Sequence, residues 1–251
     1  MRRKLAIVPA YNEEASVASV VDDLRRHAPD FDVLVVDDGS TDDTSARARQ
    51  AGAMVLRMPF NLGIGGTVQA GYQYALEGDY DFAVQVDGDG QHDASELDKL
   101  TRMFHERPDV HMVTGSRFLC VDDDGHRSTR SRRAGIAIFA KVLSWITGET
   151  VTDPTSGFRM TNRRGIELFA RDYPHDYPEV EAVLMIHAHQ LRSAEVPVRM
   201  RPRVAGESSI NASQSLYYMV KVLLAIFVGL FRARPTVRRG DEAPVTAESS
   251  I

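Results

Sequence analysis

Short apolar runs alternate with amphipathic stretches along the first half of the chain, and this alternation limits the folds open to it. Each run has the length of a buried strand, and each stretch between runs has the apolar spacing of a helix that covers a sheet. Such an order predicts an α/β protein with a mostly parallel sheet flanked by helices. The expected strands are 5–8, 33–36, 54–58, 82–86 and 110–114, and the expected helices are 15–27, 41–50, 67–76 and 95–105.

The alternation ends near residue 117, where an arginine-rich loop begins. Beyond it we expect helices near 134–147 and 180–191 and strands near 158–160 and 194–200, which would form a second half of the domain. A chain of 251 residues can bury the core of one α/β domain with a short appendage. We assign the domain to residues 1–213, an apolar C-terminal helix to 214–234 and a disordered tail to 235–251, where the sequence is polar and without periodicity.

Polar clusters stand at the carboxyl ends of three expected strands. In open α/β sheets this edge is where ligands bind. Three clusters at one edge therefore mark a binding site. They are Pro9-Ala10-Tyr11-Asn12-Glu13, Asp37-Asp38-Gly39-Ser40 and Asp87-Gly88-Asp89-Gly90-Gln91.

The pair Asp87 and Asp89 follows a buried strand and makes that strand end strongly acidic. Carboxylate oxygens select Mg²⁺ or Mn²⁺, and these ions keep waters and bind substrate phosphates rather than sit in all-protein cages. Gln91 offers one more carbonyl oxygen. The cluster predicts a metal that neutralises charge on a leaving diphosphate. A solvated turn rich in Asp and Gly is the alternative.

The cluster at Asp37 and Asp38 offers acceptor oxygens to a base N–H or a ribose hydroxyl, while Tyr11 can stack on the base and Glu13 can reach the ribose. Ser40 is expected to be the N-cap of the following helix. In this interpretation one of the two aspartates serves only that helix end, which leaves the other for a ligand.

Other nucleotide-binding classes fit the sequence poorly. The glycines at 63, 65 and 66 follow the third strand, and Val68 stands where a dinucleotide-binding motif needs its last glycine. We read them as a loop that passes close to the ligand or as a flexible turn. A P-loop lysine motif is absent from the sequence. A net charge of −5 argues against nucleic-acid binding, which needs a basic face.

Taken in order, these motifs resemble the family 2 glycosyltransferases, and most of all the branch of dolichol-phosphate mannosyltransferases and bacterial polyprenyl-phosphate sugar synthases. The resemblance spans about residues 5–231. It implies a GT-A fold, a nucleotide-sugar donor linked to UDP or GDP, and inversion at the anomeric carbon. The further matching segments are Asn61-Leu62-Gly63, Gly115-Ser116-Arg117-Phe118, Thr155-Ser156-Gly157-Phe158-Arg159 and Arg203-Val204-Ala205-Gly206-Glu207-Ser208.

The resemblance also implies roles for single residues. Arg117 and Arg203 would face the diphosphate or the acceptor phosphate, with a surface ion pair as the alternative for either. Ser209 stands where the dolichol enzymes carry a lysine, so one phosphate contact of that branch differs. The remaining donor side would consist of Pro9, Tyr11, Glu13, Val36, Asp37, Asp38, Asp87 and Gly88, with Asp87, Asp89 and Gln91 as the metal ligands.

The acceptor side is read from basic and acidic residues in the second half. Four guanidinium groups near an active site suit a phosphate headgroup, although a solvated charge run would look the same. Glu179 or Glu181 could supply a general base, or one could cap the next helix while the other faces solvent. We assign catalytic roles to Asp89, Arg117 and Glu181. The acceptor residues are Arg130, Arg132, Arg133 and Ser156, next to Arg127.

The run 216–231 is almost wholly apolar and is followed by several arginines. It is shorter than the about 20 residues needed to span a bilayer. We expect a helix at the membrane surface, where arginines meet anionic lipid heads, or a helix packed on the protein core. With one cysteine, Cys120, and no signal-like start, the expected location is the cytosol, peripheral to the inner membrane face. A homo-oligomer or a small membrane-protein partner stays open.

The favoured function is thus sugar transfer to a polyprenyl phosphate. The alternatives are transfer to a hydroxyl of a growing glycan or small metabolite, a sugar nucleotidyltransferase, whose usual glycine-rich and basic signature is absent near residues 9–13, and a non-catalytic nucleotide-sugar sensor.

Truncation after Ser213 should release the protein from membranes and weaken its use of a long-chain lipid acceptor, because the apolar run and its arginines are removed. Liposome sedimentation of the full-length and truncated proteins measures this. Equal binding by two folded forms would mean that the run packs on the core or on a partner.

Overall fold

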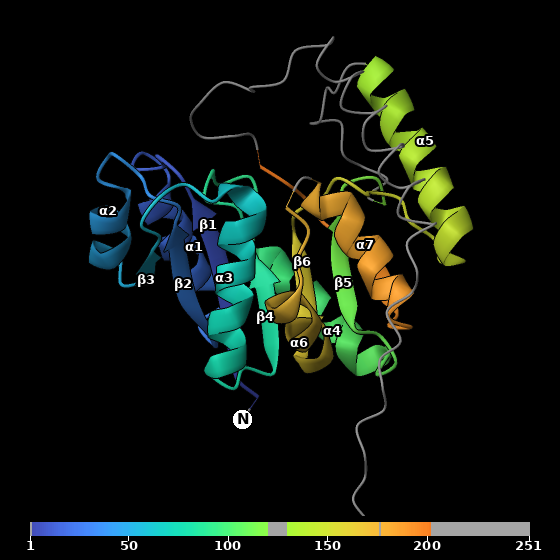
Figure 1. Ribbon diagram of the computed structural model, residues 1–251, viewed down its shortest axis with the longest axis horizontal. Coiled ribbons are helices and arrows are strands. Elements are labelled where there is room, and N and C mark those ends of the chain that lie inside the picture. Colours follow the sequence, from blue (N-terminus) through green and yellow to red (C-terminus); the bar gives the residue numbers. More distant parts are fainter. Residues whose placement is uncertain (1, 120–129, 176, 202–251) are drawn as a thin grey trace, which may run out of the picture.

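The computed structural model, which describes residues 2–119, 130–175 and 177–201, has a seven-stranded sheet between two layers of helices (Figure 1). The strand order is β3-β2-β1-β4-β6-β5-β7. β6 runs antiparallel to both of its neighbours, and the other pairs are parallel. The prediction of an α/β protein with a mostly parallel sheet is confirmed.

The strands are β1 (Lys4–Ala10), β2 (Phe31–Asp37), β3 (Met54–Arg57), β4 (Phe82–Gln85), β5 (Met112–Ser116), β6 (Arg159–Asn162) and β7 (Ser193–Pro197). The helices are α1 (Val17–His27), α2 (Thr44–Gln50), α3 (Gly63–Glu77), the short 3₁₀ helix η1 (Ala94–Glu96), α4 (Leu97–Glu106), α5 (Arg130–Thr147), α6 (Arg163–Arg171) and α7 (Pro178–Ala188).

The central strand β1 supplies both hydrophobic cores, because successive side chains of a strand point to opposite faces. Leu5 and Ile7 join one core with residues of α3, α5, α6 and α7, and Ala6 and Val8 join the other with residues of α1, α2 and α4. All four side chains are fully buried. This two-sided burial explains why the strand reads as a continuous apolar run.

Two local predictions were wrong. Helix α2 begins at Thr44 after Asp43, so Ser40 is not its N-cap; the Ser40 hydroxyl instead accepts the Asn12 N–H at 2.9 Å. The glycines at 63–66 do not form an extended loop, since α3 begins at Gly63. Gly65 is needed for packing: a Cβ there would lie 2.4 Å from the carbonyl oxygen of Pro174.

Helix α6 was not predicted. It follows β6 without an intervening turn, and the Asn162 side chain caps it by accepting the Gly165 N–H at 3.3 Å. Its Phe169 packs against Tyr72 of α3, with ring centroids 5.2 Å apart. This contact holds α3 and α6 together on one face of the sheet (Figure 1).

Among the residues described, none of the helices has the length and apolarity to cross a bilayer. The apolar helix expected at 214–234 and the tail expected at 235–251 lie outside the described residues, as does Cys120.

Candidate active site

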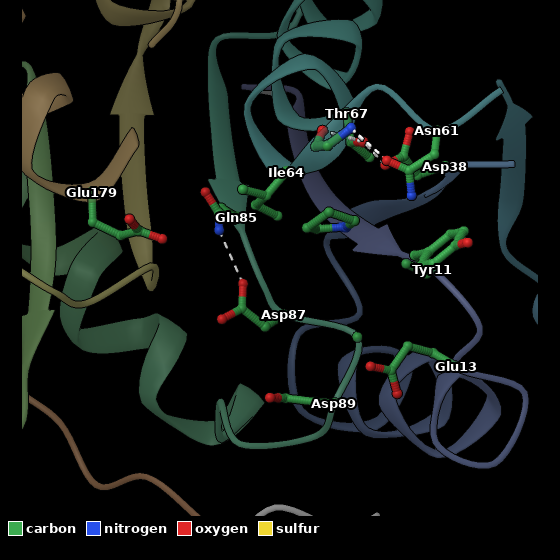
Figure 2. Close-up of a pocket in the computed structure, with 14 residues that line it drawn as sticks. Tyr11, Glu13, Asp38, Asn61, Ile64, Thr67, Gln85, Asp87, Asp89 and Glu179 are labelled. Carbon is green, nitrogen blue, oxygen red and sulfur yellow. Dashed lines mark hydrogen bonds between the residues drawn. The ribbon is translucent and has the colours of Figure 1, made fainter. Parts of the chain in front are cut away.

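A cleft of about 340 Å³ opens at the carboxyl ends of β1 and β4 (Figure 2). Its volume falls at the lower end of the range of small-molecule sites, roughly 300–1,000 Å³. All three predicted polar clusters contribute to it, so the site lies at the edge where the sequence placed it. The lining residues are Pro9, Ala10, Tyr11, Glu13, Asp38, Asn61, Gly63, Ile64, Thr67, Gln85, Asp87, Gly88, Asp89 and Glu179.

The turn after β1 presents Tyr11 and Glu13 to the cleft. Asn12 has a positive φ of 54°, a conformation that asparagine tolerates better than most residues. Its N–H donates to the Ser40 hydroxyl, and its side-chain oxygen accepts the Thr41 N–H, both at 2.9 Å. The loop after β2 thereby fixes this turn. The ring of Tyr11 is 48% exposed and is free of the core.

The two neighbouring aspartates after β2 have different surroundings. Asp37 is fully buried and accepts hydrogen bonds from the Ser40 N–H and the Ser45 hydroxyl. Burial alone would raise its pKa, but these bonds and the charge of Arg57 hold the pKa of Asp37 below its ordinary value. Asp37 therefore serves the loop and α2, and it does not line the cleft.

Asp38 does line the cleft, and it also closes the loop before α3. Its two carboxylate oxygens accept the N–H groups of Leu62 at 2.7 Å and Gly63 at 2.9 Å. These bonds hold the start of α3 over the cleft (Figure 2). Val36, the other donor-side residue expected on β2, is buried in the core beneath.

Gly88 brings the third cluster against the first. A Cβ at this position would lie 2.9 Å from the Pro9 carbonyl oxygen, so any larger residue would push the two loops apart. The Ser16 hydroxyl lies 2.7 Å from both the Gly88 carbonyl oxygen and a carboxylate oxygen of Glu13. Glu13 and the loop after β4 are thus held together.

Asp87 and Asp89 form the acidic part of the cleft (Figure 2). The Asp87 carboxylate accepts a hydrogen bond from the Gln85 amide at 2.9 Å, and the Asp87 N–H donates to Nδ1 of His92, also at 2.9 Å. Asp89 accepts the Gln91 N–H at 3.0 Å. Gln91 contributes to the turn through its backbone and does not line the cleft.

These residues suit Mg²⁺ or Mn²⁺, which share their coordination with substrate and water. They do not suit a metal that is held by protein ligands alone. Within residues 2–119, 130–175 and 177–201, the structure has no group of three or more His, Cys, Asp or Glu side chains that could hold a metal ion. One or two carboxylates are enough for these ions when substrate phosphates and waters complete the shell. Asp87 and Asp89 provide such a set on one wall.

Glu179 faces this acidic wall from the first turn of α7, and Figure 2 shows its side chain directed toward Gln85 and Asp87. Burial raises the pKa of the Glu179 carboxyl, and the charge of Asp87 adds to the shift while that of Arg159 opposes it. Glu181 lies two residues on and does not line the cleft. Residues two apart on a helix do not share a face.

Arg117 is held by a buried carboxylate. Its Nε and Nη2 donate to the two oxygens of Asp153 at 2.6 and 2.7 Å, and Nη2 also donates to the Thr155 hydroxyl at 2.8 Å. Burial alone would lower its pKa, but the bidentate pair with Asp153 raises the pKa of the guanidinium. Glu195 in turn accepts the N–H groups of Thr152 and Asp153.

Of the remaining acceptor-side residues, Ser156 alone has a described side chain, and it does not line the cleft. Ser156 is buried, and its hydroxyl accepts the Phe158 N–H at 3.3 Å. Arg130, Arg132 and Arg133 lie in the first turn of α5, where the structure describes the backbone only. Arg127 and Arg203 lie outside the described residues.

Ile64, Thr67 and Gln85 line the cleft but were not singled out from the sequence, while Ala10 and Gly63 stood in motif segments without an assigned role. Gln85 did carry a signal, because it is a polar residue at the end of an otherwise apolar strand. Asn61 stood in a matching segment without an assigned role. Glu179 was named as a base candidate, but Glu181 was chosen.

Residues 5–169 match the family described as glycosyl transferase family 2. The chain is 30% identical over 225 residues to an undecaprenyl-phosphate mannosyltransferase of Micrococcus luteus, with 83% of this chain and 88% of that protein covered. It is 29% identical over 248 residues to a polyprenol monophosphomannose synthase of Mycolicibacterium smegmatis, with 94% and 92% covered.

Among solved structures, the chain resembles glucosyl-3-phosphoglycerate synthase from Mycobacterium tuberculosis in complex with Mn²⁺, UDP and glucosyl-3-phosphoglycerate. The TM-score is 0.67 at 20% identity, and the match covers 91% of this chain and 79% of that one. This likeness shows the fold, and it confirms the GT-A architecture that the motifs implied.

Replacing Asp153 by alanine should cost about 3 kcal/mol or more of unfolding free energy, because removing one partner of a buried ion pair leaves the other unpaired. Urea unfolding measures the loss. The matched control is Asp109→Ala, since this aspartate pairs with arginines as well, with Arg107 and Arg192, but at an exposed site. Equal urea midpoints for the two variants would show that Asp153 does not anchor Arg117.

Proposed function

Because the chain belongs to glycosyl transferase family 2, we propose that it transfers a hexose or related sugar from a nucleotide-sugar to a polyprenyl phosphate, with inversion and with Mg²⁺ or Mn²⁺ as cofactor. The observation that carries the proposal is the cleft in which Asp87 and Asp89 stand beside Tyr11 and Glu13. The names of similar proteins support the acceptor: they include an undecaprenyl-phosphate mannosyltransferase, a polyprenol monophosphomannose synthase and a dolichyl-phosphate hexose transferase of Haloferax volcanii that is 31% identical.

The donor would lie along the carboxyl edge of the sheet. The nucleoside fits the side lined by Tyr11, Asp38 and Asn61, with the Tyr11 ring available for stacking. The diphosphate then reaches Asp87 and Asp89, whose carboxylates would hold the metal. When bound, the metal neutralises charge that develops on the leaving diphosphate. The donor is UDP- or GDP-linked in this proposal.

A phosphate acceptor does not need a general base to remove a proton from it. A phosphate monoester is already ionised near neutral pH, since its second pKa is roughly 6. The protein then needs to place the phosphate in line with the anomeric carbon and to offset its charge. Arg117, with Asp153 fixing its orientation, suits this role, as do the arginines that precede and begin α5.

Transfer to a hydroxyl is the second candidate, and Glu179 is the observation that favours it. A hydroxyl must lose its proton as it attacks, and the Glu179 carboxyl lies in the cleft with a raised pKa. If Glu179 were the base, activity would fall as the pH drops through that raised pKa, because only the ionised form accepts a proton.

The substrate also bears on location. A polyprenyl chain stays in the bilayer, so we propose that the enzyme works at the cytosolic membrane face, with the segment 216–231 and its arginines at the lipid surface.

Asp89→Asn should lower sugar transfer about 100-fold or more while the fold stays intact, because the metal loses a charged ligand but the loop keeps its shape. Transfer from labelled nucleotide-sugars to polyprenyl phosphate is the assay. Asp98→Asn is the control, since Asp98 is exposed on α4 and pairs with Arg102. Wild-type turnover by Asp89→Asn that remains sensitive to chelators would place the metal elsewhere.

Glu179→Gln and Glu181→Gln should each keep most of the activity, whereas Arg117→Ala and Arg130→Ala should lose it mainly in the acceptor step. The physical reason is that an ionised phosphate needs positive charge and no base. Each variant is measured at saturating donor. A folded glutamate variant that still binds donor but is more than about 100-fold slower would contradict the lipid-phosphate acceptor and favour the hydroxyl acceptor.

A further inference from the structure

Arg201 joins three parts of the chain at the end of the loop that carries Asp87 and Asp89. Its Nη1 donates to Asp23 of α1 at 2.9 Å, and its Nη2 donates to Asp93 at 2.7 Å. Its backbone N–H donates to the Gln91 carbonyl oxygen at 2.8 Å. Arg201, a single residue that follows β7 in the chain, therefore holds the end of the 87–93 loop on α1.

The two carboxylates that accept hydrogen bonds from Arg201 are shielded from water and also accept hydrogen bonds from backbone N–H groups. The side chains of Asp23 and Asp93 are only 15% and 20% exposed. Asp23 also accepts the Ala94 N–H at 3.2 Å, and Asp93 accepts the Ser95 N–H at 3.0 Å at the start of η1. Ion pairs that share hydrogen-bonded, shielded carboxylates are stronger than exposed ones. Arg201 is thus part of a fixed network.

Contacts within the 87–93 loop and to other segments add to those of Arg201, and the middle of the loop is tied to the turn after β1 by the Ser16 hydroxyl, which donates to the Gly88 carbonyl oxygen at 2.7 Å. The bond from the Asp87 N–H to His92 and the bond from the Gln91 N–H to Asp89 both lie within the loop. The ring of His92 stacks on Phe158 with centroids 4.8 Å apart, and His92 pairs with Met200 in an isolated bridge. Residues 200 and 201 therefore support the end of the loop, while β4 supports its beginning and Ser16 its middle.

We propose that Arg201 is a positioning residue of the transfer reaction: by holding the end of the 87–93 loop on α1, it fixes where Asp87 and Asp89 present their carboxylates to a metal and a donor diphosphate. The inference rests on the proposed function. Without Arg201 the loop end loses its bonds to α1, and the ligand must complete the ordering of the two carboxylates. Ordering at the moment of binding lowers affinity.

The test is a titration of the full-length protein with Mn²⁺ in the presence of UDP or, in parallel, GDP. Electron paramagnetic resonance measures the concentration of free Mn²⁺ at each step. Arg201→Ala should weaken Mn²⁺ binding roughly tenfold, the lower end of what loss of a supporting contact typically costs a metal site. Arg201→Lys, which can reach only one of the two acids at a time, should weaken it less, about threefold by the same reasoning. The control is Arg192→Ala, because Arg192 stands just before β7 and pairs with Asp109 away from the cleft.

The outcomes separate the inference from the proposed function. A tenfold loss for Arg201→Ala, an intermediate loss for Arg201→Lys and none for Arg192→Ala would support the positioning role. Equal Mn²⁺ affinity in all variants, with or without a lower melting temperature for Arg201→Ala, would overturn it and leave the proposed function standing. If Arg201→Ala does not fold, Arg201→Lys against Arg192→Ala decides in the same way. A wild-type protein that binds no Mn²⁺ with either nucleotide would contradict the proposed metal dependence and the inference together.

Discussion

The parallel pairing of β1 with β2 and β4 decides where the polar groups of the cleft lie. Ala10 is in register with Asp37, and Ile7 is in register with Gln85. The three chain segments that follow these strands must therefore leave the sheet at the same edge. Because β1 is buried on both faces, its register cannot slip without moving apolar side chains out of both cores. The position of the site is thus fixed by hydrophobic packing some distance from it.

The cleft concentrates negative charge, and this charge explains the kind of ligand that it can take. Its acidic lining consists of Glu13, Asp38, Asp87, Asp89 and Glu179. Asp38 is balanced by two backbone N–H groups, and Glu179 feels the charge of Arg159. Asp87 and Asp89 follow one strand and lie on one wall, so they are the pair best placed for a cation. A diphosphate alone would be repelled by such a wall, whereas a divalent ion between the two is attracted to both.

Much of this arrangement could be predicted from the sequence because strand order and strand ends follow from apolar patterning. The patterning placed Tyr11, Glu13, Asp38, Asp87 and Asp89 at one edge, and the structure brings them into one cleft. Patterning does not say where a side chain points once the chain leaves a strand.

The errors of prediction follow from that limit. Ser40 looks like a helix cap in the sequence, yet its hydroxyl serves the turn at Asn12, which is 28 residues away. Glu179 and Glu181 look alike in the sequence, and the structure places Glu179 in the lining of the cleft, while the choice of a base between them stays a prediction. Contacts between distant segments, such as that of Arg201 with Asp23, leave no local pattern to read.

We propose that Asp87 and Asp89 receive a metal together with the donor diphosphate. Anomalous diffraction from crystals grown with Mn²⁺ and UDP or GDP can locate that metal. We expect a manganese peak in the cleft, about 2 Å from a carboxylate oxygen of Asp87 or Asp89 and from an oxygen of the diphosphate. A nucleotide bound in the cleft without manganese, or a manganese peak away from both carboxylates, would contradict it.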